Sequence, residues 1–296
     1  MKSSKHIIGE IKWFSFVIPA LVLYVWFFWV PSFQSIYYSL TNWDGVHSEF
    51  IGIQNYIKLF QDKQILNSLG NTIFYTVMIT MIQNVAGLLL AVLLKKGSRK
   101  NNICRTLLFT PYILSFLLIG FVFKFILEAN IGAFNNILRS LNLDFLIRPW
   151  ISDPSVSKWI IVLVTVWQAT GYTMVINIAG LQSISECYYE AAKLDGASKW
   201  QQFFKITIPL IAPSTTINIM LCLIGNLQIF DQIYALTGGG PAYRTESIAV
   251  TMYRLGFGAA GSRWGYGAAM AVVTFGIILI ITLVTTTLLR KREVEI

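Results

Sequence analysis

Amide and aromatic side chains interrupt two of the long apolar segments of this 296-residue sequence. Trp167 and Tyr172 lie in one such segment, and Asn226 and Gln228 lie in a later one. Amide groups can hydrogen-bond hydroxyls, and aromatic rings can stack on the apolar face of a sugar ring. The four residues are therefore candidates for binding a neutral, hydroxyl-rich solute. Helix packing, lipid contact and interhelical hydrogen bonds are alternatives that the sequence alone leaves open.

Residue types suited to catalysis or metal binding are sparse. The three cysteines are widely spaced with no Cys-x-x-Cys pair, and the histidines are His6 and His47. The Gly238-Gly239-Gly240 cluster is not followed by the Lys-Ser or Lys-Thr of an ATP-binding loop. No cluster of acids or histidines indicates a membrane-embedded enzyme. We therefore predict no catalytic residue, no metal and no cofactor, and we expect that the chain is not an enzyme.

The composition is that of a membrane protein. Hydrophobic residues make up 55% of the chain, charged residues make up 12%, and the mean hydropathy is +0.61, whereas soluble domains carry about 25% charged residues. Apolar segments of about 20 residues, each able to cross a ~30 Å hydrocarbon core, recur along the sequence. We predict an all-α integral membrane protein, forming one domain over residues 1–296, with six transmembrane helices near residues 13–39, 69–94, 106–127, 159–181, 206–230 and 267–289.

The basic residues predict the orientation of these helices. Net charge is +9, but the lysines and arginines form short clusters beside the apolar segments, a pattern of membrane topology and not of nucleic-acid binding. The basic start Met1–Lys12 precedes an apolar run, Trp13–Val30, that is longer than a signal-peptide core, so we expect a retained first helix. Because most basic residues fall in the short loops on one side, both termini are predicted to be cytoplasmic.

The predicted cytoplasmic loop between the fourth and fifth helices has an unusual pattern. Ser183 followed by Glu186 suggests a capping box, and Gly196 supplies a helix stop. Trp200 and the aromatic residues after it begin a second short amphipathic helix. We expect a helix-turn-helix outside the membrane. An interfacial helix pair resting on lipid headgroups is the alternative.

Two motifs carry a resemblance to a known family. The predicted cytoplasmic loop resembles the EAA loop of the membrane subunits of ABC importers, although that family usually has Leu where this chain has Ile208; the matching residues are Glu190, Ala191, Ala192, Gly196, Ile206 and Pro209. Other segments resemble the sugar-permease branch that contains the maltose and glycerol-phosphate permeases; they include Phe50–Gly52, Asn55-Tyr56, Asn71-Thr72, Ala179–Ile184 and Thr237–Pro241.

The resemblance implies a type I ABC importer permease fold with a core over residues 69–289 and a coupling loop over residues 186–209. It implies a bacterial cell-membrane subunit that works with a second, different permease chain, two ATP-binding subunits and an extracellular solute-binding protein, and that translocates a sugar or small oligosaccharide. ATP would be used by the partner subunits.

Site residues follow from the same resemblance. The EAA residues would couple to the ATP-binding subunits, and Gly239, Gly240 and Pro241 would contact the binding protein. Trp167, Tyr172 and Asn226 fall where maltose-type permeases contact substrate, whereas Thr165, Ala169 and Cys222 depart from that pattern. Two alternatives stay open: an ion-coupled secondary transporter, and an ABC permease for a glycerol-phosphate-like solute.

Overall fold

The computed structural model describes residues 16–258 and 263–291. Within these residues the chain is helical and has no β-strand, only an isolated bridge between Thr41 and Phe50, which confirms the predicted all-α class. The predicted basic start at 1–12, the beginning of the first predicted span at 13–15, part of the last predicted outer loop at 259–262 and Arg292 lie outside the described residues.

The described residues form two compact units. Unit 1 comprises the residues up to Asp62 together with Met252–Phe275, and unit 2 comprises Lys63–Thr251 together with the residues from Gly276 onward. The candidate site described below lies wholly within unit 2.

The long helices fit the predicted membrane spans. Four segments are long and apolar enough to cross a membrane unbroken: Phe16–Tyr38, α4 (Lys63–Leu94), α8 (Ser157–Ser183) and α15 (Trp264–Arg290). Two further helix pairs qualify only together, because each is bent: α5 (Arg99–Ile113) with α6 (Phe116–Ile126) by 94°, and Lys199–Leu210 with α12 (Ala212–Leu227) by 64°. Counting each bent pair as one span gives the six spans that the sequence predicts.

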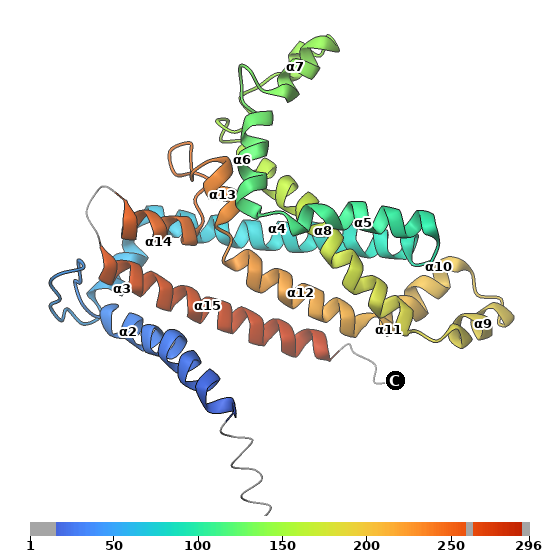
Figure 1. The fold of residues 1–296 in the computed structure, drawn as a ribbon, viewed down its shortest axis with the longest axis horizontal. Helices are drawn as coiled ribbons and strands as arrows, with labels where there is room; N and C mark the ends of the chain where they lie inside the picture. The colour runs from blue at the N-terminus through green and yellow to red at the C-terminus, as the bar shows by residue number, and fades with distance from the viewer. Residues whose placement is uncertain (1–15, 259–262, 292–296) are drawn as a thin grey trace, which may run out of the picture. The chain divides into compact units, whose positions relative to one another are not determined.

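Shorter helices form parts of the spans or connect them. They are α2 (Val30–Tyr38), which completes the first span, α3 (Gln54–Gln61), α7 (Ala133–Ser140), α9 (Glu186–Leu194), α10 (Lys199–Gln202), α11 (Ile208–Leu210), α13 (Asp231–Leu236) and α14 (Ile248–Phe257). Within unit 2, α9 and α13 lie at opposite ends of the layer formed by α4, α8 and α12 (Figure 1).

The break between α5 and α6 corrects the prediction of one continuous helix over 106–127. Pro111 lies inside α5 and Leu114 is extended, so the helix stops at Ile113. Carbonyl groups freed by a break in an apolar environment need donors from elsewhere. Gln168 on α8 supplies them, because its Nε2 donates to the carbonyl oxygens of Pro111 at 3.3 Å and Leu114 at 3.1 Å. This amide therefore stabilises the bend.

A second break precedes α12. The predicted fifth span begins at 206, whereas the straight helix begins at Ala212, after a wide π-helical turn at Phe203–Thr207 and the short α11. Pro209 and Pro213 each occupy a first-turn position of the helix that follows the break, where a missing N–H costs least. The segment before Ala212 thus forms the bent first part of the fifth span and joins the loop to the straight helix.

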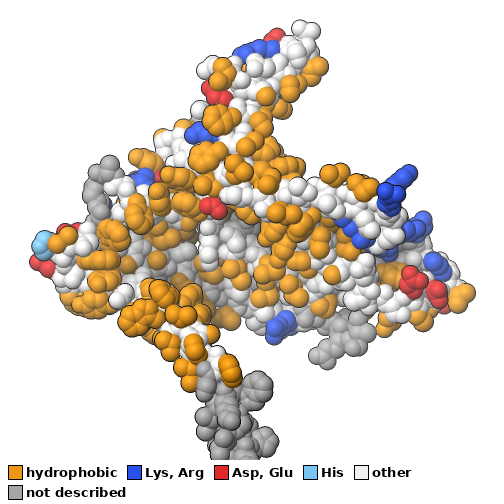
Figure 2. Space-filling view, in the orientation of Figure 1, with side chains coloured by type: hydrophobic (Ala, Val, Ile, Leu, Met, Phe, Trp, Pro, Cys, Tyr) orange, Lys and Arg blue, Asp and Glu red, His pale blue; other side chains and the backbone are white. Residues whose placement is uncertain are grey.

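The core of unit 2 is formed by α4, α8 and α12 with α5, α6 and α13 against them. Two buried apolar clusters mark its ends: one includes Tyr75, Ile161 and Ile233, and the other includes Met174 and Ile211. Many hydrophobic side chains also lie on the surface (Figure 2). Such a surface fits a protein whose solvent is lipid, where apolar exposure costs little.

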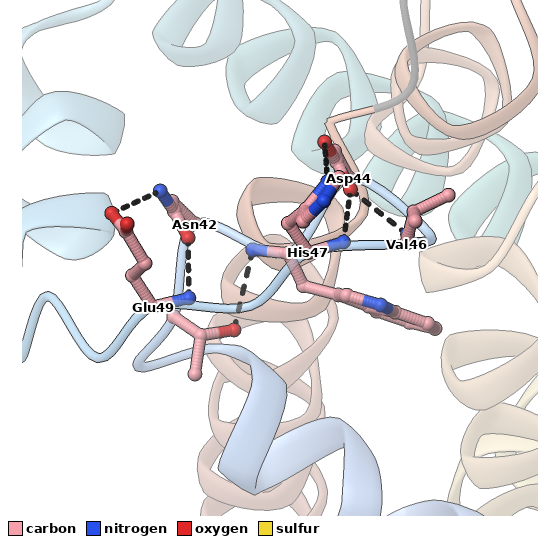
Figure 3. A network of polar contacts seen from close by, with 7 residues as sticks. Asn42, Asp44, Val46, His47 and Glu49 are labelled. Carbon is pink, nitrogen blue, oxygen red and sulfur yellow. Dashed lines mark hydrogen bonds and ion pairs between the residues drawn. The ribbon is translucent and has the colours of Figure 1, made fainter.

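Unit 1 contains a hydrogen-bonded loop after its first span (Figure 3). The side-chain Oδ1 of Asn42 accepts from the backbone N–H of Glu49 at 2.7 Å. The carboxylate of Asp44 accepts from the backbone N–H groups of His47 at 2.7 Å and Val46 at 2.9 Å. These two bonds hold the pKa of Asp44 below its ordinary value, with the bond from His47 the larger cause. The loop is thus an ordered turn.

Candidate functional site

A partly open cavity of about 360 Å³ lies in unit 2 between α4, α8 and α12. Its α8 wall consists of Thr165, Ala169 and Tyr172, which recur at three- and four-residue spacing and so share one helical face. Polar and aromatic side chains from the other elements complete it, among them Gln83, Tyr112, Asn226, Gln228, Asp231 and Gln232. The structure therefore brings together Tyr172, Asn226 and Gln228, three of the four residues predicted to bind solute.

The aromatic part of the cavity is a stacked pair of tyrosines. The rings of Tyr112 and Tyr172 lie 4.5 Å apart between centroids at an angle of 15°. Tyr112 comes from α5, directly after Pro111, so the helix break places it here. An aromatic face with hydroxyls at its edge suits a solute with both apolar and hydrogen-bonding surfaces. Tyr112 was not among the residues predicted from the sequence, although the neighbouring Pro111 is a sequence signal for the helix break that places it here.

The amide side chains of the cavity have different roles. Gln83 Nε2 donates to Thr173 Oγ1 at 2.8 Å, and Asn226 Nδ2 donates to Thr80 Oγ1 at 3.3 Å, so both join neighbouring helices. Gln232 is only 4% exposed, and its Nε2 has no hydrogen-bond partner among the described residues. A buried donor without a partner is costly. Gln232 therefore differs from Gln83 and Asn226, whose amides join neighbouring helices.

Trp167 does not line this cavity. A helix turns by about 100° per residue, so Trp167, two residues from both Thr165 and Ala169, lies on the opposite face of α8. Trp167 is 49% exposed, and its ring packs edge-on against Phe123, with 5.3 Å between ring centroids. The aromatic residues on α5 and α8 that do line the cavity are Tyr112 and Tyr172. Packing or lipid contact is the reading that the structure favours for Trp167.

The EAA segment folds as two short helices joined by a sharp turn. Helix α9 ends at Leu194, and Gly196 follows with φ +73°. The N–H of Gly196 donates to Lys193 O at 3.1 Å, and the N–H of Ala197 donates to Ala192 O at 2.8 Å. This pair of bonds is the Schellman motif, which needs a left-handed residue between the two helices. The helix stop predicted at Gly196 is confirmed.

The predicted capping box at Ser183 and Glu186 is wrong. Ser183 is still part of α8, and its hydroxyl donates to Gly180 O at 2.8 Å. Ser185 caps α9 instead, accepting from the N–H of Cys187 at 3.4 Å. A capping box occurs one helix later, between Ser198 and Gln201. Its Ser-x-x-Gln pattern could have been found from the sequence.

The other EAA residues divide between surface and interior. Glu190 and Ala191 are exposed on α9, whereas Ala192 is half-buried. Ile206 and Pro209, at the far end of the segment, are half-buried near the start of α12. The first half of the segment thus offers a free surface, and the second half fastens it to the membrane helices.

The Thr-Gly-Gly-Gly-Pro loop follows α13 at the opposite end of unit 2. Asn71 on α4 holds it, because its Nδ2 donates to Arg244 O at 2.8 Å and Glu246 O at 2.9 Å. Gly239 is buried with φ +88°, and a Cβ there would lie 2.4 Å from Glu246 Cγ. Gly239 therefore shapes the turn and lies inside it, and its predicted contact with a binding protein stays a prediction. Gly240 and Pro241 are half-buried, and Ala242 and Tyr243 are exposed.

Among the described residues, no group of His, Cys, Asp and Glu is placed to hold a metal ion. The cavity is lined instead by hydroxyl, amide and aromatic groups, which bind by hydrogen bonds and stacking.

Comparison with known proteins identifies the family. The family model described as "Binding-protein-dependent transport system inner membrane component" matches residues 83–294. The chain belongs to this family of multi-pass membrane permeases.

Curated relatives match the chain along nearly its whole length. It is 35% identical to the "Probable starch degradation products transport system permease protein AmyD" of Thermoanaerobacterium thermosulfurigenes, covering 99% of each chain. It is 31% identical to the "Multiple sugar-binding transport system permease protein MsmF" of Streptococcus mutans, covering 98% of this chain and 99% of that one.

A solved structure confirms the predicted fold. The fold of this chain matches that of a chain in the crystal structure of a bacterial alginate ABC transporter in complex with alginate pentasaccharide-bound periplasmic protein. The TM-score is 0.85 at 22% identity, over 97% of this chain and 96% of that one. The ABC importer permease fold implied by the sequence is therefore present.

Proposed function

We propose that this chain is the permease subunit of an ATP-driven importer that moves a sugar or small oligosaccharide delivered by an extracellular binding protein. The observation that carries the proposal is the layout of unit 2, in which one set of helices joins a tyrosine- and amide-lined cavity to the EAA helix pair. The relatives named for starch degradation products and for multiple sugars support the substrate class.

The proposed assembly contains three kinds of partner protein. A second, different permease chain completes the pathway, two ATP-binding subunits contact the 186–209 loop, and the binding protein approaches the opposite end near Gly240 and Pro241. The chain itself acts as a single permease domain over residues 1–296, performs no catalysis and needs no cofactor of its own. ATP binds only to the partner subunits.

A neutral solute fits the cavity better than an anionic one. Asp231 is the one charged side chain among its described lining residues, and no lysine or arginine lines it. A carboxylate repels phosphates and uronates, whereas it can accept hydrogen bonds from sugar hydroxyls. This charge balance favours neutral sugars over the glycerol-phosphate-like alternative.

The substrate class is tested through the cognate binding protein. We expect neutral mono- or oligosaccharides, and not sugar phosphates or uronates, to bind it in titration calorimetry. The same complexes should stimulate ATP hydrolysis by the assembled transporter. Selective binding and stimulation by a phosphorylated or acidic glycan would overturn the neutral-sugar assignment.

We further propose that the chain lies in the bacterial cytoplasmic membrane with both termini and the 186–209 loop in the cytoplasm. Lys and Arg side chains gather at the end of unit 2 that carries α9 and α10 (Figure 2), which supports this orientation through the positive-inside tendency.

The orientation has a direct labelling test. Single cysteines at Ser98 and Ala242, in a cysteine-free variant, should react from opposite sides of the membrane, since both residues are exposed at opposite ends of unit 2. An impermeant thiol reagent should label only the Ala242 position in intact cells with a permeable outer envelope. Labelling of Ser98 under the same conditions would reverse the orientation.

A further inference from the structure

Helix α9 packs against the rest of unit 2 through one aromatic side chain. Its side chains are exposed except those of Tyr189 and Ala192, which are half-buried. Tyr189 packs against the buried cluster that contains Ala91 on α4, Met174 on α8 and Ile211 before α12. An otherwise exposed nine-residue helix is marginal by itself. Its contact with the long helices of unit 2 therefore runs mainly through this side chain.

Both ends of the Tyr189 side chain are engaged. Lys95 Nζ lies 5.0 Å from the ring centroid, within the range of a cation–π interaction. The phenol oxygen lies 3.0 Å from Thr207 Oγ1, where either hydroxyl can donate. Thr207 is 5% exposed and its hydroxyl also reaches Gln202 O at 3.4 Å. Tyr189 thus contacts the end of one long helix and the turn that leads into another.

Those two helices are the ones that form the cavity. Lys95 directly follows α4, whose end is fixed because Arg105 Nε donates to Leu94 O at 3.1 Å. Further along, α4 supplies Gln83 to the cavity wall, while the helix after Thr207 supplies Asn226. Close-packed elements transmit displacement because their interiors compress little. A push on α9 would reach both helices through Tyr189.

We propose that Tyr189 is the positioning residue that transmits movement of the EAA loop to α4 and α12. This inference rests on the coupling role proposed for the loop. It adds the side chain through which a movement of the loop reaches the long helices. Glu190 and Gly196 lie on the exposed side of the loop, where a partner can dock, whereas Tyr189 lies on the side that packs against the long helices. Loss of Tyr189 should therefore spare docking and impair transport.

The test compares variants of the assembled transporter in proteoliposomes. Tyr189→Ala is expected to retain the ATP-binding subunits and basal hydrolysis, while sugar transported per ATP hydrolysed falls about tenfold, within the range known for residues that couple distant sites. Lys95→Ala should give a smaller loss, and the matched control Lys96→Ala should behave as wild type, because Lys96 is not placed over the ring.

If Tyr189→Ala does not assemble, a double-mutant cycle on the Tyr189–Thr207 hydrogen bond tests the proposal instead. Tyr189→Phe and Thr207→Val each remove one partner of the same hydrogen bond. The double variant should therefore lose no more transport per ATP than the more impaired of the two single variants. Additive losses would overturn the link. Normal transport per ATP in Tyr189→Ala would overturn it as well, while leaving the loop's coupling role intact if Glu190→Ala still uncouples. If Glu190→Ala also behaves as wild type, the coupling role itself fails.

Discussion

Glu190→Ala is expected to leave the chain folded in the membrane and to impair coupling of ATP hydrolysis to sugar uptake. Glu190 is exposed on α9, and loss of a solvated surface charge usually changes stability by less than ~0.5 kcal/mol. At a subunit contact, however, a carboxylate can form charge-assisted hydrogen bonds, each worth about 1.5–3 kcal/mol. A loss of roughly tenfold or more in ATPase retention, or in transport per ATP hydrolysed, is therefore expected only if α9 docks on a partner.

Gly196 provides an independent change at the same loop. No atom lies within 4 Å of the position that a Cβ would occupy, so a substitution here meets backbone strain and not a clash. Gly196→Val should disrupt the Schellman turn at a cost of about 1 kcal/mol or more and redirect α10, because a β-branched residue tolerates positive φ poorly. Gly196→Asn is the matched control, since asparagine adopts this conformation more readily.

Both variants are assayed on purified complexes. The readouts are retention of the ATP-binding subunits and stimulation of hydrolysis by sugar-loaded binding protein. We expect Glu190→Ala and Gly196→Val to lose one or both, and Gly196→Asn to stay close to wild type. Wild-type behaviour of Glu190→Ala in both assays would support the alternative that α9 and α10 only rest on lipid headgroups.

Tyr172→Ala and Asn226→Ala are expected to impair sugar uptake without loss of assembly. Both residues line the cavity, and a lost stacking surface or amide contact is worth about 1–3 kcal/mol, or roughly 5- to 150-fold in binding. Trp167→Ala, on the opposite face of α8, should cost much less. Uptake per amount of assembled transporter, measured with the labelled neutral sugar, is the quantity to compare.

Asn226 needs a separate control because it also joins two helices. Thr80→Val removes the acceptor of the Asn226 hydrogen bond and leaves the amide in the cavity. If Asn226 contacts the solute, Thr80→Val should transport much better than Asn226→Ala. Equal losses in the two variants, or uptake that falls only with protein level, would assign Asn226 to helix packing.

Much of the fold follows from local sequence patterns. Apolar length places the six spans, and the positive φ at Gly196 follows from a glycine after a helical repeat. The bends were not predicted, because the sequence stays apolar through Leu114 and Ile211. A proline breaks a membrane helix only where another part of the protein supplies hydrogen-bond donors to the freed carbonyl groups. Gln168 supplies them at the first bend from more than fifty residues away, and such a contact cannot be found from sequence spacing.

The candidate site was predictable only in part. One cavity is lined by Tyr172, Asn226 and Gln228 but not by Trp167. The family resemblance indicates positions in the sequence, whereas the rotation of the helix determines which face each side chain occupies. Tyr112, Asp231 and Gln232 come from the helix break and from the segment after α12, so their proximity depends on tertiary folding. Gly239 is buried because a glutamate 7 residues later folds back onto it.

The central claim is that this chain moves a neutral sugar with energy from ATP hydrolysed by partner subunits. Its most direct test uses proteoliposomes containing the complex purified through this chain, with binding protein and labelled neutral oligosaccharide on one side and ATP on the side of the ATP-binding subunits. We predict accumulation that requires hydrolysable ATP and persists when ionophores dissipate all ion gradients. Accumulation without ATP, driven by an imposed ion gradient, would contradict the account and establish a secondary transporter instead.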